Sequence, residues 1–400
     1  FFGNKISPMT YNPLISVIIH NYNYGRFLRQ CLESVAEQTY QNIEIMISDN
    51  DSDDDSWKII LEFDKKYPGK FSIAKNRRNL GPYKNFRVWA SNINGDFWFN
   101  LCSDDYIEKN FLERAVRAFE KHPKSSYLMS HRSIIDQDEC EIFEAPFFDR
   151  DCVLHPPGLS LLYMKAAVVA SNSQMIYRVN KTPFNNNYPT GSHGIFRSYF
   201  GARFTDFFSS INGSMIYLKQ PYVKNRVHAE NHGRYVEQHL LDIIGAYGLA
   251  HEFKEIAIEK LPEHAEKFET ELAPSIEKHA NTALRYAVRF LQAGNNSLAK
   301  RYVYLAVALN PLSPWSNTNE IATFKPLSNS PPPVKVNWLP IVHDLPPSVP
   351  ELFFTPIEAP PATVTSPAYA EVATREPAKA VKPSFLNLFI LITPFFDVNY

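Results

Sequence analysis

The sequence predicts an α/β fold built around a parallel sheet. Three short runs rich in β-branched and aromatic residues each end in a cluster of polar side chains, at residues 15–19, 43–48 and 96–101. Helix-like segments separate the runs, as is typical of parallel strands that are connected by helices. Polar residues at the carboxyl ends of such strands meet in one crevice, where open α/β sheets bind ligands.

The segments around these strands have the spacing of helices. Apolar side chains recur every three or four residues in 27–38 and again in 111–122, which predicts helices that each cover one sheet face. Strand and helix signals mix from 127 to 236, where turn-rich stretches indicate loops that shape a site. From 236 to 309 the apolar spacing is again helical.

Proline dominates the remaining sequence. Half of the 30 prolines lie after Lys325, and residues 356–383 have the composition of an extended linker. A strand-like run at 385–393 follows this linker. We therefore expect the polypeptide to be cut from a longer, multi-domain protein.

The bulk properties exclude several classes of protein. A net charge of -1 provides no field for nucleic acid or acidic membranes. The four cysteines lack a CxxC spacing, which argues against a disulfide framework or a zinc site. The longest apolar run, 385–396, is shorter than the roughly 20 residues of a spanning helix, and the first residues do not resemble a signal peptide. We expect a soluble cytoplasmic protein, and peripheral membrane association stays open.

The polar clusters belong to a longer series of motifs. These motifs are residues 15–23, residues 31–40, Asp49-Asn50-Asp51-Ser52, Asn79-Leu80-Gly81, Gly95-Asp96 and Ser103-Asp104-Asp105. In this order and spacing, over roughly the first 130 residues, they resemble the opening of the family 2 glycosyltransferases. The resemblance implies a Rossmann-like type A glycosyltransferase domain, which the helices and the Pro-rich tail then follow.

The resemblance assigns donor-binding roles to residues after the first two strands. Tyr22 would stack beside the base of a nucleotide, and Asp49 would accept a hydrogen bond from the N–H of that base. His20 stands where the family commonly has proline or threonine, and it joins the donor-binding candidates. The alternatives are a core tyrosine at Tyr22 and a turn or helix-capping aspartate at Asp49.

The third cluster corresponds to the family's Asp-x-Asp motif. Counted from Gly95, the motif falls on Cys102-Ser103-Asp104, so Cys102 replaces the first acid and Asp104 falls on the metal-binding acid. Asp104 and Asp105 are adjacent hard oxygen ligands at a strand end, which suits Mg²⁺ or Mn²⁺. Ser103 and Asp104 also join the donor-binding candidates. A surface turn with two aspartates is the alternative.

Four further residues take roles from the resemblance. Arg77 and Arg78 are candidates to bind the diphosphate, because guanidinium groups suit phosphate oxygens, and a solvated surface pair is the alternative. Asp206 lies where the family has its catalytic acid-aspartate pair, beside Thr205, and is the candidate general base. His228 ends an arginine-x-histidine motif and would complete the metal shell or contact the diphosphate, unless it only closes the loop.

The resemblance implies a metal-dependent, inverting glycosyltransferase of polysaccharide or glycoconjugate biosynthesis. With Mn²⁺ or Mg²⁺ as cofactor, it would transfer sugar from a nucleoside-diphosphate sugar, with a UDP-sugar favoured, to a hydroxyl of a glycan or lipid-linked glycan. One alternative is a degenerate glycosyltransferase-like domain that binds a glycan or scaffolds an assembly, as Cys102 and Thr205 suggest. The other is a nucleotidyltransferase, which should have a Gly-rich loop after the first strand, whereas residues 20–25 hold one glycine.

These inferences divide the chain into four parts. The glycosyltransferase domain takes residues 1–235, with nucleotide-sugar binding in 13–130 and the acceptor and catalytic part in 131–235. A helical appendage, a Pro-rich extended segment and the start of a further, truncated domain then follow, in residues 236–320, 321–384 and 385–400.

Overall fold

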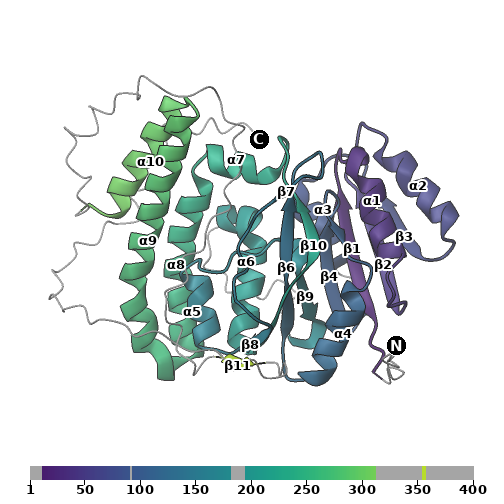
Figure 1. Cartoon of the computed structure of the whole chain (residues 1–400), viewed down its shortest axis with the longest axis horizontal. Coiled ribbons are helices and arrows are strands. Elements are labelled where there is room, and N and C mark those ends of the chain that lie inside the picture. Colours follow the sequence, from purple (N-terminus) through teal and green to yellow (C-terminus); the bar gives the residue numbers. More distant parts are fainter. Residues whose placement is uncertain (1–10, 91, 182–193, 312–353, 357–400) are drawn as a thin grey trace, which may run out of the picture. The chain divides into compact units, whose positions relative to one another are not determined.

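The chain forms one mixed sheet with helices packed on both faces (Figure 1). The computed structural model describes residues 11–90, 92–181, 194–311 and 354–356. The strands run in the order β11-β8-β10-β6-β9-β4-β1-β2-β3, with β5 paired to β10 and β7 paired to β6. Their bounds are β1 Ile15–Asn21, β2 Ile43–Asp49, β3 Phe71–Lys75, β4 Phe97–Cys102, β5 Tyr106–Ile107, β6 Tyr127–Ile135, β7 Glu141–Ile142, β8 Cys152–Leu154, β9 Met175–Arg178, β10 Met215–Arg226 and β11 Phe354–Pro356.

The strands β4, β1, β2 and β3 are parallel neighbours, which confirms the predicted α/β fold. Their register aligns His20 with Cys102 and Asn21 with Asp49, so the predicted polar clusters end at one edge of the sheet. Gly95 precedes β4 at a place where a Cβ atom would lie 2.6 Å from the Ser16 hydroxyl. Only glycine fits this close approach between the two segments of the chain.

Helices on the two faces enclose separate cores. Helices α1, α2 and α4 cover one face, where Phe97 packs against Phe119 of α4. Helices α3, α5, α6 and α8 cover the other face, where Trp98 and Tyr177 stack in a cluster of buried aromatic residues. The bounds are α1 Gly25–Ala36, α2 Ser56–Lys66, α3 Pro82–Ala90, α4 Phe111–Lys121, α5 Gly158–Met164, α6 Gly194–Asn212, α7 His232–Gln238, α8 Leu241–Lys260, α9 Ala265–Gln292 and α10 Asn296–Leu309.

The strands and helices predicted before residue 130 are confirmed, and β3 is an addition. Its apolar side chains alternate over only five residues, which is a weak strand signal. The helical spacing predicted for 236–309 is confirmed by α8, α9 and α10. Within the predicted Pro-rich segment, β11 pairs with β8 in antiparallel fashion. The strand predicted at 385–393 lies outside the described residues.

The described elements fall into two compact units. The first holds the elements up to Ser275 together with β11, and the second holds the rest of α9 and α10. In the second unit, Tyr302 of α10 packs against Tyr286 and Phe290 of α9. The division at residues 235 and 320 stays a prediction. In the part of the chain described here, no helix is long and apolar enough to span a membrane.

Candidate active site

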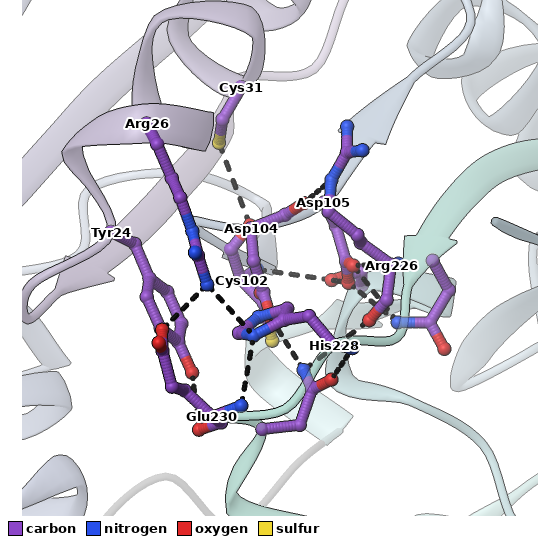
Figure 2. Close-up of polar contacts among 12 residues, drawn as sticks. Tyr24, Arg26, Cys31, Cys102, Asp104, Asp105, Arg226, His228 and Glu230 are labelled. Atoms are coloured by element: carbon purple, nitrogen blue, oxygen red, sulfur yellow. Dashed lines mark hydrogen bonds and ion pairs between the residues drawn. The ribbon is translucent and has the colours of Figure 1, made fainter. Parts of the chain in front are cut away.

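The turn after β4 brings together the acids that the sequence singles out. Asp104 and Asp105 lie between β4 and β5, and ligand atoms of Cys102, Asp104 and Asp105 all lie within 4.8 Å of one another. Figure 2 shows these residues beside the end of β10 and the start of α1. The structure thus brings the predicted metal residues Asp104, Asp105 and His228 together.

Asp104 is held through one oxygen. Its Oδ2 lies 3.2 Å from Nε2 of His228 and accepts a hydrogen bond from Nδ2 of Asn231 at 2.9 Å (Figure 2). Its Oδ1 accepts no hydrogen bond from the residues that the structure describes. The carboxylate therefore has a fixed orientation and keeps one oxygen for a ligand.

Asp105 differs because both of its oxygens are already occupied. Oδ1 accepts hydrogen bonds from the Arg226 backbone N–H at 2.8 Å and from Asn225 Nδ2 at 3.0 Å. Oδ2 accepts hydrogen bonds from Asn225 Nδ2 and from the Ser173 hydroxyl. Burial, with the Asp104 carboxylate beside it, raises the pKa of Asp105 to about 7. Asp105 joins three chain segments at the site.

His228 lies between Asp104 and the first turn of α1. Its ring contacts Tyr24 and Phe27, with centroids 5.1 and 5.0 Å apart. Its Nδ1 faces two groups that can only donate, the Glu230 N–H at 3.3 Å and Arg26 Nη2 at 3.4 Å. These neighbours assign the ring hydrogen to Nε2, which then donates to Asp104.

Arg226 is a site residue for which the sequence analysis proposed no role. It is 3% exposed, and its guanidinium donates hydrogen bonds to the Asp104 backbone oxygen, Gln30, Glu139 and the Asp136 backbone oxygen. The signal that could have identified it is the arginine of the Arg-x-His motif. Its many contacts make it a support for the turn that carries Asp104.

Hydrogen bonds to the Asp49 carboxylate hold the turn after β2. Its Oδ1 accepts hydrogen bonds from Asn21 Nδ2 at 3.0 Å and the Ser52 hydroxyl at 2.6 Å, and its Oδ2 accepts one from the Ser52 N–H. Asp51 in the same turn has a φ of 63°, which aspartate tolerates better than most residues. The Asp49 side chain is 0% exposed, so its contact with a base stays a prediction.

The other donor candidates near β1 and β4 differ in exposure. His20 Nδ1 lies 3.1 Å from Asn100 Oδ1, and burial lowers the pKa of His20. Ser103 is buried, whereas Tyr22 is 41% exposed. Tyr22 is thus the ring of this group that is open to a ligand.

Amide side chains connect the ends of β1, β2 and β3, a feature that sequence reasoning missed. Asn76 donates to Asn50 and Asn85, both at 2.9 Å, and Asn50 donates to Asn79 at 2.7 Å. Asn85 in turn donates to the Asn21 backbone oxygen. The density of asparagines at the strand ends was the available signal. The network fixes the loop that carries Arg77 and Arg78.

Arg77 and Arg78 lie away from the acid cluster. Both side chains are exposed and follow β3, which is separated from β4 by β2 and β1. Three strand spacings amount to about 14 Å. The structure does not bring these arginines together with Asp104, and their contact with a diphosphate stays a prediction.

Asp206 lies on α6 within the aromatic cluster. It is 3% exposed and accepts a hydrogen bond from the Tyr177 hydroxyl, near buried Phe204 and Phe207. Tyr177 pairs with Trp98, four residues before Cys102, so this contact lies toward the opposite end of β4 from Asp104. Burial raises the pKa of Asp206 to about 7. Its role as a base stays a prediction.

The donor atoms at the turn fit a hard divalent cation. Asp104 Oδ1 is free of protein hydrogen bonds among the described residues, and carboxylate oxygen is a preferred ligand of Mg²⁺ and Mn²⁺. Burial raises the pKa of the Cys102 thiol, which keeps it protonated and makes it a poor ligand. Of the clustered groups, Asp104 is therefore the one best prepared to hold a cation.

The first part of the chain matches a known protein family. Residues 16–139 match the family described as Glycosyl transferase family 2. An uncharacterized glycosyltransferase of Haemophilus influenzae is 26% identical over 187 residues, which are 44% of this chain and 57% of that relative. Chondroitin synthase of Escherichia coli is 28% identical over 126 residues, which are 32% of this chain and 18% of that relative. The chain thus spans less than two thirds of the length of these relatives.

Solved structures with similar arrangements have low sequence identity. S. aureus TarS in complex with UDP-GlcNAc is 19% identical, with a TM-score of 0.47 over 74% of this chain and 84% of that one. A mannosyltransferase from Pyrobaculum calidifontis, in complex with GDP-Man and Mn2+, is 14% identical, with a TM-score of 0.43 over 78% of this chain and 80% of that one. Residues 16–139 of this chain thus match glycosyl transferase family 2, and the curated relatives are glycosyltransferases.

Proposed function

We propose that this chain is a metal-dependent glycosyltransferase, which moves a sugar from a nucleoside-diphosphate sugar to a hydroxyl of a glycan or lipid-linked glycan. The observation that carries the proposal is Asp104, which is fixed through one carboxylate oxygen by His228 and Asn231 while the other oxygen is left for a ligand. A relative from Escherichia coli is a chondroitin synthase, which supports a glycan acceptor and a role in polysaccharide or glycoconjugate biosynthesis.

The residues around Asp104 have separate tasks in this proposal. Asp104, with His228 beside it, would hold Mn²⁺ or Mg²⁺, which supplies positive charge to the departing diphosphate. Asp105 and Arg226 keep the turn in place through the hydrogen bonds described above. Tyr22 offers an exposed ring to the base, and we favour a UDP-sugar as the donor.

Asp206 is the proposed general base. It would take the proton of the acceptor hydroxyl as that oxygen attacks the anomeric carbon with inversion. A pKa of about 7 suits a base that works near neutral pH. Because Asp206 is buried beside Tyr177, the acceptor reaches it only if the aromatic cluster opens.

The second candidate is a catalytically inactive domain that binds a glycan or scaffolds an assembly. It is favoured by Cys102 in place of the first acid of the motif and by the burial of Asp206. Sugar transfer or donor hydrolysis with Mn²⁺ present distinguishes the two, because only the enzyme turns over.

Thermal shift with a panel of nucleoside-diphosphate sugars, with and without Mn²⁺, tests the proposal. A ligand at 100 times its Kd adds about 2.7 kcal/mol of stability. We expect a shift that requires the cation, and Asp104→Ala should abolish the cation-dependent part of binding in calorimetry. Asp53→Ala is the control, because Asp53 is an exposed aspartate outside the acid cluster. Unchanged affinity of Asp104→Ala with Mn²⁺ present would contradict the assignment of Asp104.

A further inference from the structure

Arg26 lies beside the acid cluster, although no sequence motif pointed to it. It occupies the first turn of α1, directly after the polar end of β1. Its Nη2 lies 2.6 Å from Glu230 Oε2 and 3.4 Å from His228 Nδ1, and His228 Nε2 in turn lies 3.2 Å from Asp104 (Figure 2). A guanidinium is thus one histidine ring away from the proposed cation ligand.

The other cations near Asp104 are committed to protein groups. Arg226 is buried and donates to four oxygens of the protein. Lys224 donates to Ser133 and Glu141. The side chain of Arg26 is 47% exposed, and Glu230, its one acidic partner in the described part of the chain, is 61% exposed. An ion pair this exposed contributes only about 0.2–1 kcal/mol, so its exchange for another anion costs little.

A change of tautomer at His228 would favour the same exchange. Arg26 and the Glu230 N–H both donate toward Nδ1, which keeps the ring hydrogen on Nε2. A neutral imidazole that binds a cation through Nε2 carries its hydrogen on Nδ1, where the guanidinium lies. The form of His228 suited to a cation is therefore the form that repels Arg26.

We infer that Arg26 is a further donor-binding residue, whose guanidinium leaves Glu230 to bind the diphosphate of the nucleotide sugar. This inference rests on the proposed function. A guanidinium matches phosphate oxygens with two parallel hydrogen bonds, and the N-terminus of a helix also favours anions. Arg26 combines both features at the end of β1, next to β4, whereas Arg77 and Arg78 follow β3, which β1 and β2 separate from β4.

Calorimetry on four variants tests the role of Arg26. Nucleoside diphosphates and their nucleosides are titrated with Mn²⁺ present, using UDP and uridine first. Arg26→Ala should weaken binding of the diphosphate about tenfold or more and leave binding of the nucleoside unchanged. Arg26→Lys should lose less, because it keeps the charge without the two-pronged geometry. Glu230→Gln should bind the diphosphate at least as tightly as wild type, since it removes the competing carboxylate.

Arg29→Ala is the matched control. Arg29 lies one turn further along α1 and forms a pair with Glu62 at the same 2.6 Å and with similar exposure, but it has no contact with His228. Equal diphosphate affinity in Arg26→Ala and Arg29→Ala overturns the inference, as does an equal loss for the nucleoside. If wild type binds no nucleoside diphosphate, the proposed function fails and the inference falls with it. If wild type binds the diphosphate and Arg26→Ala binds it equally well, only the inference about Arg26 is rejected and the proposed function stands.

Discussion

Asp105 and Asp206 are two buried aspartates with the same raised pKa and opposite surroundings. Burial raises the pKa of each to about 7, and both are at most 3% exposed. Asp105 accepts four hydrogen bonds from Ser173, Asn225 and Arg226. Asp206 accepts a hydrogen bond from Tyr177 within a cluster of aromatic side chains.

Burial and a raised pKa do not by themselves identify a functional aspartate. A raised pKa is common at active sites, but structural networks raise pKa values as well. The four hydrogen bonds that Asp105 accepts hold the turn that carries Asp104, which makes Asp105 a positioning residue in this structure, and its role as a metal ligand stays a prediction. Asp206 lies in the environment that keeps a carboxyl group basic near neutral pH, and it is buried among the residues that the structure describes.

Asp206→Asn should have the largest effect on the reaction. The amide keeps the shape and removes the basicity, so kcat and kcat/KM should fall together by about 10²- to 10⁴-fold. Donor affinity should stay near that of wild type, because a base that acts on the acceptor does not hold the donor. Initial rates and calorimetric donor binding measure the two quantities.

Tyr177→Phe is the control for this prediction, since it removes the hydrogen bond to Asp206 and keeps the carboxyl group. It should retain much more activity than Asp206→Asn. A rate above about half that of wild type in Asp206→Asn would give Asp206 the same structural role as Asp105. The next acids to test as the base are then Asp149 and Asp151.

Asp105→Ala should lower the free energy of unfolding more than a substitution of an exposed aspartate does. It leaves the Ser173 hydroxyl, the Asn225 amide and the Arg226 N–H without their buried acceptor, at a cost of about 2–4 kcal/mol in the free energy of unfolding. Urea denaturation without metal measures this loss. Asp53→Ala, an exposed control, should change it by less than about 0.5 kcal/mol. A loss as small in Asp105→Ala would remove its positioning role.

The sequence predicted the position of the site better than the roles within it. Apolar runs with polar ends mark where parallel strands meet, so the grouping of Asp104 and Asp105 followed from local pattern. The occupation of Asp105 did not, because its partners lie 68, 120 and 121 residues away in the sequence. The distance of Arg77 from Asp104 likewise depends on the strand order, which places β3 at the far side of β1 and β2.

The burial of Asp206 likewise could not be predicted from the sequence. The motif fixed its place in the chain, but the aromatic cluster around it forms from β6, β9, α5 and α6, which come together only in the folded sheet. The contrast between the two aspartates is therefore a property of tertiary packing.

The remaining expected effect is a pH dependence of stability that belongs to Asp206. Its pKa in the folded chain is about 7, above the roughly 3.9 of an unfolded aspartate, so between these values the folded state keeps a proton that the unfolded state releases. Stability from this group is complete below pH 4 and is lost as pH rises through 7. The groups that interact with it are Tyr127 of β6, Tyr163 of α5, Tyr177 of β9 and Arg203 of α6.

Asp206→Asn cannot titrate, so the stability of wild type relative to this variant should fall between pH 4 and pH 7, by no more than about 1.4 kcal/mol per pH unit. Urea denaturation of both proteins at pH 4.5, 5.5, 6.5 and 8 measures the difference. Because both proteins contain Asp105, its own titration largely cancels, and the remaining slope reports Asp206 alone. Parallel curves across this range would mean that Asp206 is already ionised in the folded chain, which would contradict its raised pKa.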